Sequence, residues 1–174
     1  LCLESMPGDP HIMHAAIRGA AKAAGKPWGT HIAMGWYGGL TLDELWHKRW
    51  RAALYHAYIS GAGFIWPESG HYTYPDPQRR RTLAFNAPQT KQTRRILREC
   101  YQFSRVHTRP DAEPTVTLGV VHGNHDGAPG LWNRYAWGQF HNPKWLEGPA
   151  ERGWTLVDGF HRKEDWPNEA VQGD

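Results

Sequence analysis

Cysteine is scarce in this sequence: 2 of the 174 residues are cysteine, too few for a disulfide framework or a four-cysteine zinc site. Each of them, Cys2 and Cys100, lies among apolar residues, so we expect two buried free thiols. Long hydrophobic runs are missing too. No stretch approaches the roughly 18–20 apolar residues that cross a bilayer, and we therefore expect no membrane partner.

An excess of one charge is also missing. The formal net charge is +3, and basic residues cluster once, at residues 79–81. We therefore expect no nucleic-acid partner, because such a partner normally requires a wider basic surface. The chain is 40% hydrophobic and 21% charged, which is typical of a globular protein and argues against intrinsic disorder.

Tryptophan, by contrast, is abundant: 10 Trp accompany 7 Tyr and 5 Phe. Aromatic side chains dominate protein cores, but exposed rings also stack on flat ligands. Trp46 and Trp50 fall on a predicted helix, so we expect them to pack in the core. Trp28, Trp36 and Trp66 lie at predicted strand ends or loop starts, where stacking on a ligand is open to them.

Strands and helices are predicted to alternate along the first 110 residues. Asp9 and Pro10 suit the start of a helix, and Gly25 suits its end. A capping-box pattern at Thr41 predicts the start of a second helix, which Gly61 would end. The expected elements are strands at 1–3, 28–35 and 62–66, and helices at 10–24, 42–60 and 88–104. This alternation predicts a parallel sheet with covering helices.

The carboxyl ends of parallel strands meet at one rim of a sheet, where ligands bind in barrels and in open α/β sheets. This rim would gather Glu4, Glu68, Trp36 and Tyr37. Two carboxylates at one rim can divide proton donation from nucleophilic or base work. The alternative is that each carboxylate caps a loop or pairs with a neighbouring His or Arg. We expect His31, inside a strand, to be a buried histidine with its hydrogen bonds satisfied.

Other candidate residues lie near this rim. Trp66, His71 and Tyr72 flank Glu68 in the sequence and are predicted to contact substrate. Farther along, a strand at 116–121 leads into a Gly-Asn-His-Asp loop at 123–126, of the kind that dimetal phosphoesterases carry. The companion Asp-x-His and Gly-Asp-x-x-Asp loops are absent, so a Gly-rich turn is the alternative interpretation. We expect Asn124 and Trp132 to fold toward the barrel mouth and contact substrate.

Two segments, 25–39 (Gly-Lys-Pro-Trp-Gly-Thr-His-Ile-Ala-Met-Gly-Trp-Tyr-Gly-Gly) and 58–70 (Tyr-Ile-Ser-Gly-Ala-Gly-Phe-Ile-Trp-Pro-Glu-Ser-Gly), resemble the closing strands of a glycoside hydrolase (β/α)8 barrel. The likeness includes the family 42 β-galactosidases, in which a flavodoxin-like domain follows the barrel. The resemblance implies an α/β chain with barrel strands and helices at 1–109, a linker at 110–114 and part of a second α/β domain at 115–174. It departs from the family pattern, which places the acid after strand four and the nucleophile after strand seven. Here Glu4 and Glu68 would follow strands six and eight, and the strand ending at Trp36-Tyr37, where the nucleophile belongs, carries no carboxylate.

We therefore expect the C-terminal part of a carbohydrate-active enzyme that hydrolyses glycosidic bonds of an oligosaccharide or polysaccharide. Glu68 and Glu4 are the candidate catalytic residues, and no cofactor or metal is expected. Two alternatives remain: a non-catalytic carbohydrate-binding or scaffolding module, and a metal-dependent phosphoesterase that uses the Gly-Asn-His-Asp loop.

Overall fold

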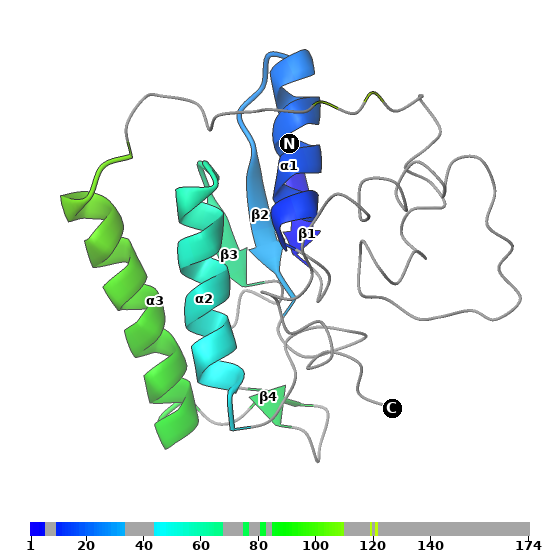
Figure 1. The fold of residues 1–174 in the computed structure, drawn as a ribbon. Coiled ribbons are helices and arrows are strands. Elements are labelled where there is room, and N and C mark those ends of the chain that lie inside the picture. The colour runs from blue at the N-terminus through cyan, green and yellow to red at the C-terminus, as the bar shows by residue number, and fades with distance from the viewer. Residues whose placement is uncertain are drawn as a thin grey trace, which may run out of the picture.

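A computed structural model describes residues 1–5, 10–33, 44–67, 75–76, 81–82 and 85–109, together with residues 119 and 121. Strands and helices alternate along these residues (Figure 1). In chain order they are β1 (Cys2–Ser5), α1 (Pro10–Ala23), β2 (Gly29–Ile32), α2 (Trp46–Ile59), β3 (Ile65–Pro67), β4 (Pro75–Asp76), β5 (Arg81–Thr82) and α3 (Pro88–Val106). The short strands β4 and β5 pair with each other in antiparallel orientation.

The first three strands form a parallel sheet whose spatial order, β1-β2-β3, follows the order of the chain. Leu3 lies opposite Thr30 in β2, and Thr30 lies opposite Ile65 in β3. The prediction of a parallel sheet over this part of the chain is confirmed. Because the strand order does not reverse, successive right-handed crossovers place the connecting helices on a single face of the sheet.

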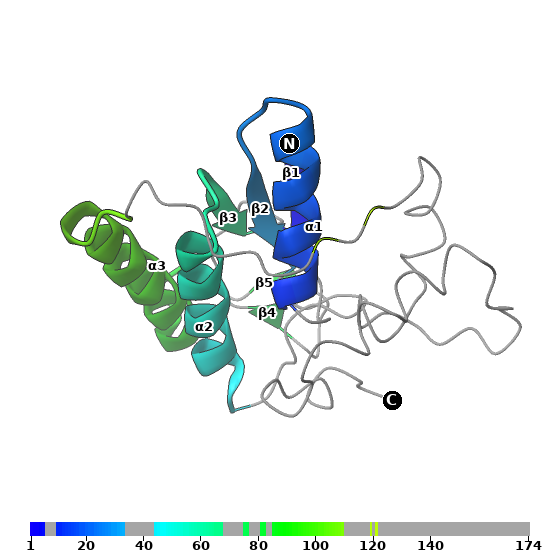
Figure 2. The ribbon, with the colours of Figure 1, turned by 45° about the horizontal axis from the view of Figure 1, so that its top comes forward.

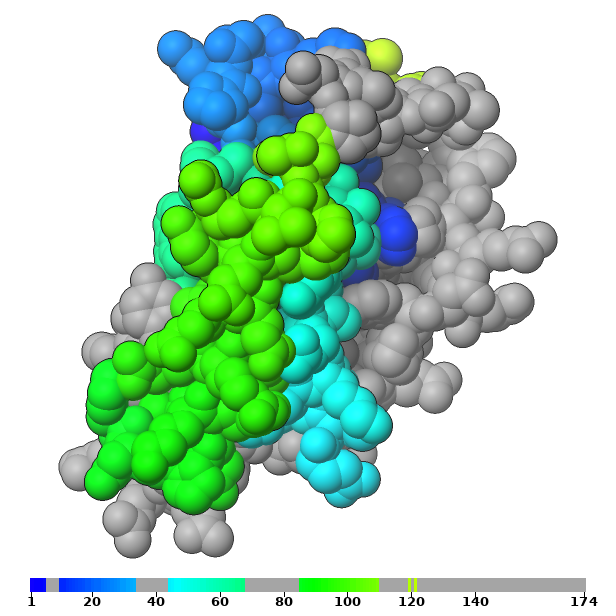
Figure 3. Space-filling model, turned by 90° about the vertical axis from the view of Figure 1, so that its left-hand side faces the viewer, coloured from blue at the N-terminus to red at the C-terminus, as the bar shows by residue number. Residues whose placement is uncertain are grey.

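One face of the sheet is covered by helices, as Figures 1 and 2 show. Leu3 packs against Ile12 and Met13 of α1. Ile32 packs in a cluster formed by α2 and α3, whose buried members are Trp46, Trp50, Leu54, Ile96 and Cys100. Helix α3 lies along α2, and Figure 3 shows α3 at the surface of the molecule. The predicted core positions of the two helical tryptophans are confirmed, since both are 0% exposed.

Glycine ends both of the first two helices. Gly25 has φ 60°, and the N–H groups of Gly25 and Lys26 donate to the carbonyls of Lys22 and Ala21. Gly61 has φ 108°, and α2 ends with the same pattern of two hydrogen bonds. A left-handed residue after the last turn is the conformation that glycine adopts most readily, and these bonds satisfy carbonyls that the helix leaves open. The predicted helix ends at both glycines are confirmed.

Three local predictions were wrong. Glu4 lies within β1 and not after it, because the ladder continues through Ser5, whose carbonyl accepts a hydrogen bond from the Ala33 N–H. Helix α2 begins at Trp46, four residues after the predicted start. Cys2 is exposed, since it lies in a strand at the edge of the described sheet, whereas Cys100 is buried as expected.

Arg109, which follows α3, binds the backbone at the end of α2. Its guanidinium donates to the carbonyls of Tyr58 and Ala62 at 2.9 and 3.1 Å, and it lies 4.8 Å from the centre of the Tyr58 ring. The predicted linker at 110–114 lies outside the described residues, as does the predicted second domain at 115–174 apart from residues 119 and 121. These two fall in the strand predicted at 116–121, and neither is in a strand. Within the described part of the chain, none of the helices has the length and apolar character needed to span a bilayer.

Candidate functional site

A row of three side chains crosses the sheet on the face away from the helices. Glu4 of β1 lies opposite His31 of β2, and His31 lies opposite Trp66 of β3. Successive side chains of a strand point to opposite faces. Leu3 and Ile32 point to the helices, so Glu4 and His31 point to the other face. We call Glu4, His31 and Trp66 the cross-strand row.

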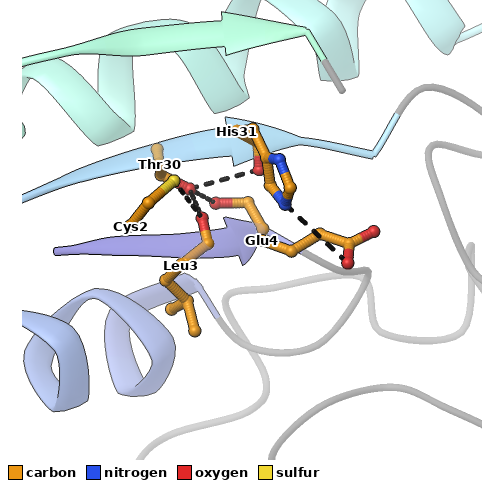
Figure 4. A network of polar contacts seen from close by, with 6 residues as sticks. Cys2, Leu3, Glu4, Thr30 and His31 are labelled. Carbon is orange, nitrogen blue, oxygen red and sulfur yellow. Dashed lines mark hydrogen bonds and ion pairs between the residues drawn. The ribbon is translucent and has the colours of Figure 1, made fainter. Parts of the chain in front are cut away.

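The carboxylate and the imidazole of the row lie close together. Nε2 of His31 is 3.8 Å from Oε2 of Glu4, and Figure 4 shows the two groups pointing toward one another. The two side chains are 28% and 30% exposed. They form an ion pair when His31 is protonated, and both remain partly open to a solute. The prediction of a buried His31 was wrong, because its side chain lies on the face of β2 away from the described helices and is 28% exposed.

Aromatic rings form the other end of the row. The His31 and Trp66 rings meet edge to face with centroids 6.0 Å apart, and Phe64 stacks on Trp66 at 5.2 Å with 21° between the planes. Gly29 makes room for this pair, because a Cβ at position 29 would collide with the ring and the backbone carbonyl of Phe64. Trp66 is only partly buried. That Trp66 offers a flat surface to a ligand stays a prediction.

Hydroxyl groups on the opposite face of the sheet hold the strands together directly behind the row. Ser5 follows Glu4 and Thr30 precedes His31, and their side-chain oxygens are 2.6 Å apart. Thr30 also donates to the carbonyl of Leu3 at 2.7 Å. Thr30 is fully buried, so these bonds are shielded from competing water. They fix the separation of the two backbones that carry the carboxylate and the imidazole.

Most of the predicted site residues lie outside the described residues: Glu68, Trp36, Tyr37, His71, Tyr72, Asn124 and Trp132. Glu4 and Trp66 are the two that the described structure contains, and it brings both onto one face. His31, which joins them, was missed as a functional candidate. The sequence signal that could have found His31 is the alternation of side chains along a strand, which places Glu4 and His31 on the same face of neighbouring strands. The sequence alone does not give the register of these strands.

The described residues contain no group of three or more His, Cys, Asp or Glu side chains placed to hold a metal ion. The Gly-Asn-His-Asp loop lies outside them. Comparisons with protein-family models, with curated proteins and with solved structures found no match. The interpretation of the site therefore depends on its own geometry and chemistry.

Proposed function

We propose that the chain is the C-terminal part of a (β/α)8 barrel enzyme that hydrolyses glycosidic bonds, with the cross-strand row facing the barrel interior. The order β1-β2-β3 without reversal, with α1 and α2 on one face, supports this proposal. A doubly wound sheet reverses its strand order and places helices on both faces. In a barrel, the face without helices points inward to a packed core, and substrate binds at the carboxyl ends of the strands.

The observation that carries the proposal is the row itself: one carboxylate, one imidazole and one aromatic surface on the same face. Glycosidases pair two carboxyl groups, one of which donates a proton to the leaving oxygen. Glu4 supplies one carboxylate, and we propose Glu68, which follows the last residue of β3 in the sequence, as the second. His31 holds Glu4 in position and exchanges a proton with it, and Trp66 stacks on the apolar face of a sugar ring.

Glutamine variants of the two carboxylates test this function in the intact protein. With a panel of nitrophenyl glycosides, we expect Glu4→Gln and Glu68→Gln each to lower turnover about 100-fold or more, because removal of a general acid, base or nucleophile has at least this cost. Glu99→Gln is the matched control. Glu99 is a carboxylate of α3 that pairs with Arg51 at 2.7 Å and Arg95 at 3.5 Å, on the side away from the row. Full turnover by Glu4→Gln would remove Glu4 from the mechanism.

A second function, non-catalytic carbohydrate binding, is favoured by one observation: Glu4 is already engaged by His31. In such a module the pair would stiffen the sheet, and recognition would come from the rings. Trp66→Ala separates the two proposals when glycan binding is measured by calorimetry beside turnover. A binding module loses affinity in Trp66→Ala and keeps it in Glu4→Gln, with no turnover in either protein or in the wild type.

A further inference from the structure

A chain of polar side chains runs from the surface of α1 to the sheet, on the face that the helices cover. Nδ1 of His11 lies 3.4 Å from Nε2 of His56, and Nδ1 of His56 lies 3.0 Å from Nδ1 of His14. Nε2 of His14 then lies 3.1 Å from the hydroxyl of Ser5, which continues to Thr30. We call these five residues the imidazole–hydroxyl chain. They come from α1, α2, β1 and β2.

The buried end of the chain sets the direction of its hydrogen bonds. A backbone carbonyl only accepts, so the proton of the Thr30 hydroxyl points to the carbonyl of Leu3, 2.7 Å away. Thr30 has no second proton to give to Ser5. The 2.6 Å contact between the two hydroxyls therefore uses the proton of Ser5. Ser5 has then spent its own proton, and its oxygen accepts from Nε2–H of His14.

The same reasoning fixes the imidazoles. A neutral histidine has one N–H and one acceptor nitrogen, and each bond determines what the other nitrogen can do. His14 donates from Nε2, so its Nδ1 accepts, and the donor at 3.0 Å is Nδ1–H of His56. Nε2 of His56 is then an acceptor, and Nδ1–H of His11 donates a hydrogen bond to it. One terminal carbonyl thus determines the positions of five protons.

We propose that the imidazole–hydroxyl chain is a pH-sensitive latch, which holds α2 to α1 behind the β1–β2 ladder while His14 and His56 are neutral and opens between the two helices when they are protonated. A second proton on His14 would sit on Nδ1 and face Nδ1–H of His56, so two donors would meet at 3.0 Å. The two rings are stacked with centroids 5.0 Å apart, which also brings two cations into contact.

The surroundings of the chain oppose this charge. His14 is 2% exposed. Burial, followed by the nearby charges of His56, His11 and Arg18, lowers the pKa of His14 from its ordinary 6.5 to about 3. Burial and His11 lower the pKa of His56 to about 4. Among the described residues, the charged or titratable groups that face the chain are these three histidines and Arg18 of α1; β1 and β2 contribute hydroxyls.

The latch lies directly behind the candidate site. Ser5 and Thr30 adjoin Glu4 and His31 in the sequence, and the two pairs lie on opposite faces of the same ladder. A second proton on His14 disrupts its contact with His56, whereas Nε2–H still donates to Ser5 and the Ser5–Thr30 bond is kept. Acidification is therefore expected to separate α1 from α2 and to leave the Glu4–His31 contact in place.

Nitrogen-detected NMR of the histidine rings in the intact protein tests the proposal. At neutral pH we expect His14 as the Nε2–H tautomer and His56 as the Nδ1–H tautomer, and neither should take up a proton near 6.5 while the protein stays folded. The opposite tautomer at either residue, or an ordinary titration in the folded protein, would overturn it.

A serine variant tests the latch without removing a ring. Ser5→Ala deletes the acceptor for His14, so we expect the exchange of the His14 ring proton with solvent to accelerate about tenfold or more. Ser104→Ala is the matched control, since that hydroxyl bonds to the Tyr101 carbonyl on the exposed surface of α3. Unchanged exchange at His14 in Ser5→Ala would contradict the hydrogen-bond direction assigned here. Should Ser5→Ala fail to fold, the tautomers of the wild-type protein still decide.

Discussion

Mild acid should destabilise this protein through two histidines. A histidine whose pKa falls on folding stays neutral in the folded chain over a pH range in which the unfolded chain takes up a proton. Its contribution to stability is complete above the ordinary value of 6.5 and is lost as the pH falls toward the folded value, which is about 3 for His14 and about 4 for His56.

The size of this loss follows from the two values. At about pH 5 the unfolded chain has taken up most of one proton at each histidine, while the folded chain has taken up almost none. Each histidine then lowers the free energy of unfolding by about 2 kcal/mol relative to neutral pH, and the pair by about 4 kcal/mol. Domains are typically stable by about 5–15 kcal/mol, so the loss within two pH units is about a quarter to four fifths of that stability.

Urea unfolding at a series of pH values measures the effect, because its slope against pH gives the difference in bound protons between the two states. We expect that difference to approach two protons near pH 5 from this pair, with His47, whose pKa is also lowered by burial, adding to it. His56→Gln keeps a side-chain N–H donor and should remove about one proton from the difference. His107→Gln, at the exposed C-terminal cap of α3, is the control. A wild-type free energy of unfolding that stays constant between about pH 7 and pH 5 would refute the reasoning.

Three further predictions concern packing and the thiols. Gly29→Ala should lower the free energy of unfolding by about 1–3 kcal/mol in urea titrations, because the added Cβ collides with the ring and carbonyl of Phe64. An unchanged midpoint would show that β3 shifts to accommodate the methyl group without loss of stability. Trp50→Phe should lower the free energy of unfolding by about 1–3 kcal/mol as well, since the variant loses buried volume and an indole N–H that donates to a carbonyl of α3 at 3.1 Å. An unchanged free energy of unfolding would mean that neighbouring side chains fill the space that the indole leaves. A thiol reagent should label Cys2 within minutes and Cys100 only on unfolding, because Cys100 is buried and burial raises the pKa of its thiol. In Cys2→Ser the remaining thiol is Cys100, so rapid labelling of this folded variant would contradict the prediction.

The elements of the fold were largely predictable from the sequence because their boundaries depend on local chemistry. Pro10 and Pro88 begin α1 and α3, since proline suits the first helical turn, and Gly25 and Gly61 end α1 and α2. The start of α2 was not predictable in this way. The capping-box pattern at Thr41 favours an earlier start, whereas α2 begins at Trp46, with Leu45 at the cap position and no side-chain hydrogen bond at that cap.

The candidate site was less predictable, because it depends on register and on which face the helices cover. Glu4 and Trp66 could be selected as functional side chains from residue type and position. The partnership of Glu4 with His31 could not, since it joins strands separated by a helix and requires the pairing of Leu3 with Thr30 to be known. The exposure of Cys2 likewise follows from the position of β1 at one end of the described strand order, which apolar neighbours in the sequence do not reveal.

The order of the strands also bears on how the chain assembles during synthesis. Each strand of the sheet pairs with the next one along the chain, across a segment of about thirty residues, so loop closure costs little and contacts form between successive units. At about 5–20 residues per second, β2 reaches β1 within a few seconds of translation. During that interval the apolar side of α1 has only β1 to cover it, because Ala33, which completes the cluster of Ile12 and Met13, follows β2. The residue that follows β2 therefore adds cover to the helix made before it, and the sheet can grow in the direction in which the chain is made.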